Sequence, residues 1–108
     1  MDKKLVIANW KMNLPNQGIV HFVNSVIPEI TNLLSVQPVI CPPYLFIPQL
    51  FELLNKSHIL LGAQNLHSED NGAFTGEISA KLLGNYCSLV IVGHSERRRL
   101  FQETDEEI

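Results

Sequence analysis

Residues 89–98 read LVIVGHSERR, and this stretch decides the fold. It opens with four apolar residues, mostly β-branched, which is the pattern of a short strand covered on both faces. Gly93 breaks the run, and the five side chains after it can all form hydrogen bonds or carry charge. Such a strand delivers polar groups to the rim of a sheet. In parallel sheets the rim at the carboxyl ends of the strands is where ligands bind.

Three earlier stretches show the same apolar character, and they lie at residues 5–8, 39–41 and 59–63. The intervening segments carry apolar side chains at helical spacing or begin with a helix-capping residue. The helices predicted from these signals cover residues 19–33, 46–54, 80–83 and 95–101. Buried strands that alternate with helices pair in parallel through right-handed crossovers.

Two α/β architectures fit this alternation, a flavodoxin-like open sheet and the first half of a (β/α)8 TIM barrel. Polar residues follow the first, third and fourth predicted strands. They favour the barrel, because barrel sites gather residues from several strand ends. A barrel needs about 250 residues, so this chain would supply roughly its first half. We therefore predict four βα units with parallel strands, the last helix only begun, in one partial domain (1–108) without an internal boundary.

Particular residues predict where the helices begin and end. Asn16 is expected to cap the first helix, and Pro28 within it is expected to cause a kink or a restart. Pro48 is tolerable only in the first turn of the second helix. Ser79 and Gly84 are expected to cap and to end the third.

The last residues carry the signature of a further helix. Residues 104–107 read TDEE, a capping box with Thr at the cap and Glu three residues on. The first apolar residue after the cap is Ile108, where the sequence ends. A helix that is capped and not continued indicates that these residues belong to a longer chain.

Composition excludes several classes of function. The formal charge is -3, and basic residues cluster only at 97–99, beside acidic ones, which is no signature of nucleic-acid binding. The apolar run at 5–8 is too short for a signal peptide or a membrane span. Cys41 and Cys87 lack metal-ligand spacing. A disulfide between them is possible, but reduced thiols in a cytosolic protein are the favoured interpretation.

The longest predicted loop covers residues 67–77 and contains the turn signal Asn71-Gly72. Loops of this length in compact domains are usually functional or part of an interface. Phe74 lies at the centre of the loop and has no periodic partner. It either inserts into another subunit or folds back over its own core, and the sequence leaves both alternatives open.

Four motifs in register carry a resemblance to a known family. They are NWKMN (9–13), GAQN (62–65), GAFTGE (72–77) and GHSERR (93–98). With these motifs the chain resembles the triosephosphate isomerases from about residue 5 to its end. The resemblance implies interconversion of dihydroxyacetone phosphate and D-glyceraldehyde 3-phosphate, without cofactor or metal, by a cytoplasmic homodimer in glycolysis and gluconeogenesis.

By the same resemblance, Asn9 and Lys11 contact the substrate, and the catalytic residues are His94, Lys11 and Glu96. His94 is the electrophile, and Glu96 is the acidic partner that holds Lys11. These residue types suit the reaction. Moving a proton between adjacent carbons passes through an enediolate, so the site needs a cation and hydrogen-bond donors where negative charge develops. Lys11 also supplies a charge that attracts a phosphate ester, and a neutral imidazole suits the role of His94.

The resemblance also implies a subunit interface, and it implies that some of the family's active-site residues lie outside this sequence. Phe74, Thr75 and Glu77 would lie on a loop that enters the other subunit, with Arg97 as a partner across the interface. The family's general-base glutamate, closing loop and phosphate-binding glycine loops belong to a second half that these residues do not include. We therefore expect the chain alone to be inactive.

Two other functions remain as alternatives. A naturally short half-barrel would expose two sheet edges and an apolar face, and it would act as a binding or self-assembly module. An open-sheet nucleotide-binding protein is disfavoured, because no G-x-G-x-x-G or P-loop pattern follows any predicted strand.

Overall fold

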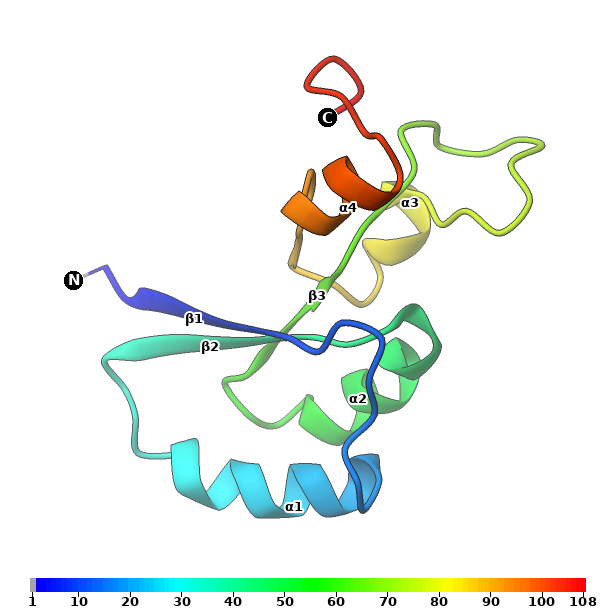
Figure 1. The fold of residues 1–108 in the computed structure, drawn as a ribbon. Coiled ribbons are helices and arrows are strands. Elements are labelled where there is room, and N and C mark those ends of the chain that lie inside the picture. Colours follow the sequence, from blue (N-terminus) through cyan, green and yellow to red (C-terminus); the bar gives the residue numbers. More distant parts are fainter. Residues whose placement is uncertain (1) are drawn as a thin grey trace.

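Strands and helices alternate along the chain in the computed structural model, which describes residues 2–108 (Figure 1). The strands are β1 (Lys4–Asn9), β2 (Val36–Cys41), β3 (Leu60–Ala63) and β4 (Leu89–Val90). The helices are α1 (Ile19–Ile30), the 3-10 helix η1 (Tyr44–Phe46), α2 (Ile47–Leu54), α3 (Ala80–Leu83) and α4 (Ser95–Leu100). The predicted alternation of strand and helix is confirmed.

The strands form one parallel sheet in the order β1-β2-β3-β4. β1 pairs with β2 along its whole length, from Lys4 opposite Val36 to Asn9 opposite Cys41. In a flavodoxin-like sheet β1 would lie between β2 and β3, which the observed order excludes. Each strand instead lies beside the next one in sequence. The chain therefore has the fold of the first half of a (β/α)8 barrel.

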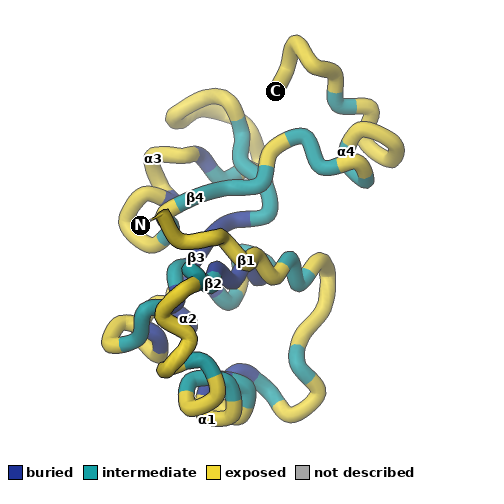
Figure 2. Tube along the Cα trace, turned by 90° about the vertical axis from the view of Figure 1, so that its left-hand side faces the viewer, coloured by how far each residue is buried: buried dark blue, intermediate teal, exposed yellow. Residues whose placement is uncertain are grey.

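The core lies between the sheet and the helices α1 and α2. Val23 of α1 and Leu50 and Leu54 of α2 are buried there. They belong to one apolar cluster with Ile40 of β2 and Leu61 of β3. Figure 2 shows these buried segments gathered where α2 meets the central strands. Helical spacing of apolar residues thus predicted the faces that α1 and α2 turn to the sheet.

The expectation that the strands are covered on both faces is wrong for β1. It is also wrong for residues 89–92, none of which is fully buried and of which Val92 is 49% exposed. Leu5, Val6 and Ile7 are 58%, 55% and 45% exposed, and the whole strand up to Asn9 is exposed in Figure 2. β1 is an edge strand, and none of its side chains belongs to the apolar cluster that α1 and α2 form with the central strands. Its apolar side chains are therefore only partly covered within residues 2–108.

The first predicted helix begins at Ile19 as expected, but its capping residue and its predicted end at residue 33 are wrong. Asn16 does not cap the helix, which begins after Gly18 (φ 88°) without a capping side chain. The helix ends at Ile30, where the N–H of the next residue, Thr31, donates to the Ile27 carbonyl oxygen. Pro28 lies inside the helix and does not restart it. The loss of its N–H removes one hydrogen bond, while apolar contacts along the helix are retained.

Predictions for the second and third helices are confirmed, whereas the predicted end of the fourth strand is not. Pro48 lies in the first turn of α2. The Ser79 hydroxyl caps α3 by accepting a hydrogen bond from the Leu82 N–H at 3.1 Å, and Gly84 ends that helix. β4 stops at Val90, two residues earlier than predicted.

The predicted capping box at residues 104–107 lies in a single turn. The N–H groups of Glu107 and Ile108 donate to the backbone carbonyl of Thr104, at 3.1 and 3.3 Å. The cap contact to Glu107 is therefore made by the main chain of Thr104 rather than by its hydroxyl.

Both cysteines are free thiols, with Cys41 buried and Cys87 partly buried. Burial, with the nearby Cys87 as a smaller cause, raises the pKa of Cys41 to about 11. Such a thiol is protonated and unreactive at neutral pH. Among the helices of residues 2–108, none has the length and apolar character required to cross a membrane.

Candidate active site

Polar side chains from several strand ends line one cleft at the carboxyl rim of the sheet. Asn9 is the last residue of β1, Gln64 follows β3, and His94 directly precedes α4. Lys11 and Glu96 also line the cleft, which has a volume of about 470 Å³. The structure therefore brings together the four residues for which sequence predicted a role in substrate binding or catalysis.

The main chain at Lys11 is strained and held in place from two sides. Its φ is 56°, in the left-handed region that costs a non-glycine residue about 1–3 kcal/mol. The Asn9 side-chain oxygen accepts a hydrogen bond from the Lys11 N–H at 3.0 Å. Gln64 Nε2 donates to the Lys11 carbonyl oxygen at 2.9 Å. Strain that neighbouring residues maintain is a common feature of functional sites.

The Lys11 ammonium pairs with a carboxylate from the opposite end of the sheet. Lys11 Nζ lies 2.5 Å from Glu96 Oε1. This hydrogen bond, together with the charge of Lys11, holds the pKa of the Glu96 carboxyl below its usual range. The Lys11 side chain remains 51% exposed, so the pair contributes little to stability. Its effect is to direct a cation into the cleft.

The His94 ring is held in one tautomer by the first turn of α4. His94 Nδ1 accepts a hydrogen bond from the Glu96 N–H at 3.0 Å. A ring nitrogen that accepts carries no proton, so the proton of the neutral imidazole is on Nε2. The separation of 3.8 Å between Nδ1 and Glu96 Oε2 is too long for a hydrogen bond. Nε2–H is left as a hydrogen-bond donor for the cleft that His94 lines.

The sequence matches one family over nearly its whole length. The family model described as triosephosphate isomerase matches residues 4–108. The chain belongs to the triosephosphate isomerase family. The resemblance carried by the four motifs is thereby confirmed.

Individual triosephosphate isomerases agree with this assignment. Those of Methylococcus capsulatus and Endomicrobium trichonymphae are 42% and 44% identical to the chain, over 98% and 100% of it. The crystal structure of triosephosphate isomerase from Bartonella henselae superposes with a TM-score of 0.87 at 36% identity over 98% of the chain. The matches cover 42% to 44% of these relatives. The chain thus spans less than half of their length.

The sequence did not predict a role for Gln64 and Tyr44, two residues at the carboxyl rim of the sheet. Gln64 Nε2 donates to the carbonyl oxygens of Lys11 and Cys41, at 2.9 and 2.8 Å, and so connects the ends of β1, β2 and β3. The hydroxyl of Tyr44 donates to the Asn65 carbonyl oxygen, and burial raises the pKa of Tyr44 to about 12. The available sequence signal was the pair of amides directly after the third strand.

The residues that the family resemblance assigns to an interface lie mostly outside the cleft. The loop of residues 67–77 projects from the sheet beyond β3 (Figure 1). Phe74 is 43% exposed, and its ring lies 4.2 Å from the His67 ring, measured between centroids. Phe74 therefore folds back onto its own loop rather than over the core. Thr75 is exposed, and Glu77 Oε2 lies 3.8 Å from His67 Nδ1.

Arg97, the fourth of these residues, lines the cleft. Its Nε donates to Glu103 Oε2 at 2.7 Å, and its guanidinium lies 4.8 Å from the centroid of the Phe101 ring. In this structure Arg97 therefore has its ionic partner within the same chain.

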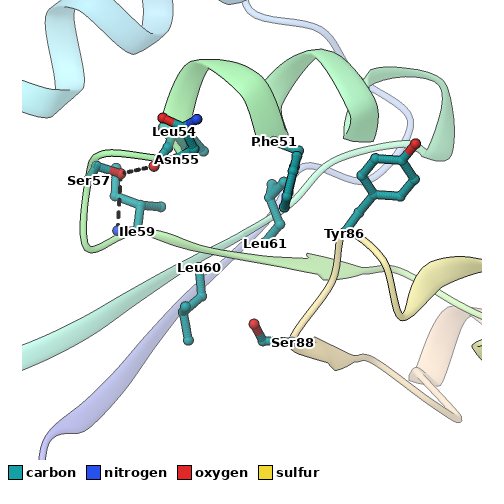
Figure 3. A pocket seen from close by; sticks show the side chains of 9 residues that line it. All are labelled: Phe51, Leu54, Asn55, Ser57, Ile59, Leu60, Leu61, Tyr86 and Ser88. Atoms are coloured by element: carbon teal, nitrogen blue, oxygen red, sulfur yellow. Dashed lines mark hydrogen bonds between the residues drawn. The ribbon is translucent and has the colours of Figure 1, made fainter.

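A second hollow, of about 180 Å³, lies beside β3 and α2 (Figure 3). Phe51 and Tyr86 meet there edge to face, with ring centroids 5.3 Å apart. The Ser57 hydroxyl donates a hydrogen bond to the Leu54 carbonyl oxygen and accepts one from the Ile59 N–H. Its lining contains no charged side chain. Within residues 2–108, no group of His, Cys, Asp and Glu side chains is arranged to hold a metal ion.

Proposed function

We propose that this chain supplies the electrophilic part of a triosephosphate isomerase site. The reaction would interconvert dihydroxyacetone phosphate and D-glyceraldehyde 3-phosphate through an enediolate. One observation carries the proposal, namely that the Lys11 ammonium and a His94 imidazole protonated on Nε2 line the same cleft. Membership of the family supports it.

The chemistry of the two groups is complementary. When a base removes a proton from the carbon beside the carbonyl, negative charge develops on the carbonyl oxygen. A neutral imidazole that donates Nε2–H to this oxygen stabilises the charge, and it can pass a proton between the two oxygens of the enediolate. His94 has the tautomer that this role requires.

Lys11 would bind and stabilise the anionic substrate. Half of its side chain is exposed, and Lys11 lines the cleft, so a phosphorylated triose can reach the ammonium. Glu96 holds that ammonium at a defined position, and Asn9 holds the Lys11 main chain. We assign Asn9 and Lys11 to substrate binding, His94 to catalysis, and Glu96 to the placement of Lys11.

The general base is not among these residues. Glu96 is committed to Lys11, and no other carboxylate lines the cleft in residues 2–108. We therefore propose that the 108 residues alone do not turn over substrate, and that activity belongs to the natural polypeptide that contains them.

The test is a coupled assay of that polypeptide, in which the dihydroxyacetone phosphate formed is reduced at the expense of NADH. His94→Gln should lower kcat by about 10²–10³-fold, the cost of losing one donor to a developing oxyanion. Lys11→Met should raise KM. His21→Gln, on the exposed face of α1, is the matched control and should leave both constants unchanged. An inactive parent protein, or a His94→Gln variant with the parent's kcat, would contradict the assignment.

We also propose a cytoplasmic homodimer that uses no cofactor and acts in glycolysis and gluconeogenesis. The interface would include Phe74, Thr75, Glu77 and Arg97. The exposure of Thr75 on a projecting loop supports this assignment. Thr75→Arg should shift the sedimentation coefficient of the natural polypeptide from dimer to monomer. If Thr75→Arg still sediments as a dimer, this loop is not part of the interface.

A second candidate function is self-assembly of the half-barrel, and the exposed apolar strand β1 favours it. An uncovered strand edge offers unpaired backbone groups to another chain. Analytical ultracentrifugation of the 108-residue chain should then show a defined dimer that Val6→Lys dissociates. Val20→Lys, on α1, is the matched control because Val20 is 51% exposed and Val6 is 55% exposed. A monomer or polydisperse aggregates would argue against this function.

A further inference from the structure

We propose that Arg98 is a positioning residue for His94, a role that rests on the function proposed above. Arg98 contacts the main chain on both sides of His94. Its Nε donates to the Gly93 carbonyl oxygen at 2.7 Å. Its backbone N–H donates to the His94 carbonyl oxygen at 3.1 Å. Arg98 therefore donates a hydrogen bond to each of the two peptide groups that flank His94.

The Arg98 guanidinium is itself anchored away from the substrate. Its Nη1 forms an ion pair with the carboxylate of Asp105, in the turn of residues 104–108. Arg97 lines the cleft, whereas Arg98 is not part of its lining. Arg98 therefore acts through His94 and not on a bound substrate.

The hydrogen bond from Arg98 restricts the backbone at Gly93, the residue directly before His94. Its φ is 60°, a left-handed conformation that glycine adopts without strain. A Cβ at this position would lie 2.9 Å from Arg98 Nη2 and would overlap the Ile108 side chain. The guanidinium and Ile108 thus lie directly on the turn between β4 and α4. Because glycine restricts its own backbone least, the hydrogen bond from Arg98 supplies the restriction.

The consequence concerns the direction of the His94 ring. The hydrogen bond from the Glu96 N–H to Nδ1 fixes the rotation of the ring. The hydrogen bond from Arg98 to the Gly93 carbonyl oxygen fixes the orientation of the peptide group between Gly93 and His94. A displacement of about 1 Å in a catalytic group can cost about a hundredfold in rate. Loss of the hydrogen bond from the Arg98 side chain to the Gly93 carbonyl is therefore expected to lower kcat and to leave substrate binding nearly unchanged.

Arg98→Lys is the informative substitution. Lysine keeps the charge but lacks the rigid fork of donors that serves Gly93 and Asp105 at once. Arg99→Lys, one residue further along the same helix, is the matched control. In the natural polypeptide, Arg98→Lys should lower kcat about tenfold with KM within about twofold, while Arg99→Lys changes neither. An active Arg98→Lys variant with the parent's kcat overturns the proposal.

NMR of the His94 imidazole gives a readout that does not depend on isomerase activity. In the parent protein, Nδ1 should resonate as an acceptor and Nε2 as a protonated nitrogen. Arg98→Lys should shift the Nε2 resonance and speed the exchange of its proton, which Arg99→Lys should not do. An unshifted spectrum overturns the positioning role even if the parent protein is inactive. An inactive parent with a shifted spectrum counts only against the proposed function.

Asp105→Asn tests the same proposal if Arg98→Lys does not fold. It releases the guanidinium from its anchor, so the bond from Arg98 Nε to the Gly93 carbonyl oxygen is held less firmly, while the backbone N–H of Arg98 still donates to the His94 carbonyl oxygen. The His94 Nε2 resonance should shift in the same direction as in Arg98→Lys and by less. No shift in Asp105→Asn overturns the proposal.

Discussion

Gly62 lies in β3, between Cys41 of β2 and Leu89 of β4. In Gly62→Ala, the new Cβ would lie 2.7 Å from Cys41 Sγ, 2.9 Å from Leu89 Cδ1 and 3.2 Å from the Leu89 carbonyl oxygen. Optimal contacts between carbon atoms are about 3.5–4.0 Å, so the overlap approaches 1 Å. Cys41 is fully buried and cannot move aside.

Two opposing effects determine the magnitude for Gly62→Ala. Overpacking of a core typically costs about 1–3 kcal/mol. Replacing glycine within a strand recovers about 0.5–1 kcal/mol of conformational entropy. The Leu89 side chain can rotate away, whereas its carbonyl oxygen and Cys41 Sγ cannot. We therefore expect Gly62→Ala to lower the free energy of unfolding by about 1–2 kcal/mol.

The assay is urea unfolding of the 108-residue chain, followed by circular dichroism. Gly84→Ala is the matched control, because its Cβ would meet only the Ala80 and Lys81 carbonyl oxygens, at 3.4 and 3.8 Å. Gly84 has a φ of -59°, so alanine there should be neutral or stabilising by up to about 1 kcal/mol. Adding Cys41→Ala to Gly62→Ala should give a coupling free energy of about 1 kcal/mol in the direction of rescue. A Gly62→Ala chain within about 0.5 kcal/mol of the parent would refute the reasoning.

Three further predictions concern a cap, a thiol and an ion pair. Ser79→Ala leaves the Leu82 N–H without its capping acceptor and should cost about 1 kcal/mol in urea unfolding. The pKa of Cys41 is raised from 9.0 to about 11, so its contribution to stability should be complete below pH 9 and disappear as the pH rises toward 11. Urea midpoints measured between pH 8 and 11 should show this decline, and Cys41→Ala should reduce it. The pKa of Glu96 is lowered, so the stability from its pair with Lys11 should be present above the ordinary carboxyl pKa and lost as the pH falls through the folded-state value. The NMR titration midpoint of Glu96 should return to the ordinary carboxyl range in Lys11→Met.

The order of strands and helices was predictable because it depends on local side-chain patterns. Apolar runs specify the strands, and three-and-four spacing specifies the faces of α1 and α2. The meeting of polar residues at one rim was predictable for a related reason. Parallel strands bring their carboxyl ends to one rim, so the polar residues after β1, β3 and β4 had to lie near one another. The roles of Asn9, Lys11, His94 and Glu96 come from the family resemblance and stay predictions.

The remaining features depend on neighbours that a pattern does not specify. The apolar character of Leu5, Val6 and Ile7 records a preference for burial, and it does not reveal whether a covering element is present. Asn16 has the side chain of a cap, yet the chain turns into α1 at Gly18, which adopts a left-handed conformation. Gln64 bridges three strand ends, a role that appears only when those ends are placed in space.

The pair between Lys11 and Glu96 joins residues 85 positions apart. During synthesis on the ribosome, a nascent chain can form this pair only after the segment at residue 96 has emerged and all four strands are aligned. Contacts at such separation form late, because the loss of chain entropy on closing the intervening loop comes first. The titration of a single carboxylate, that of Glu96, therefore reports whether the sheet has been completed.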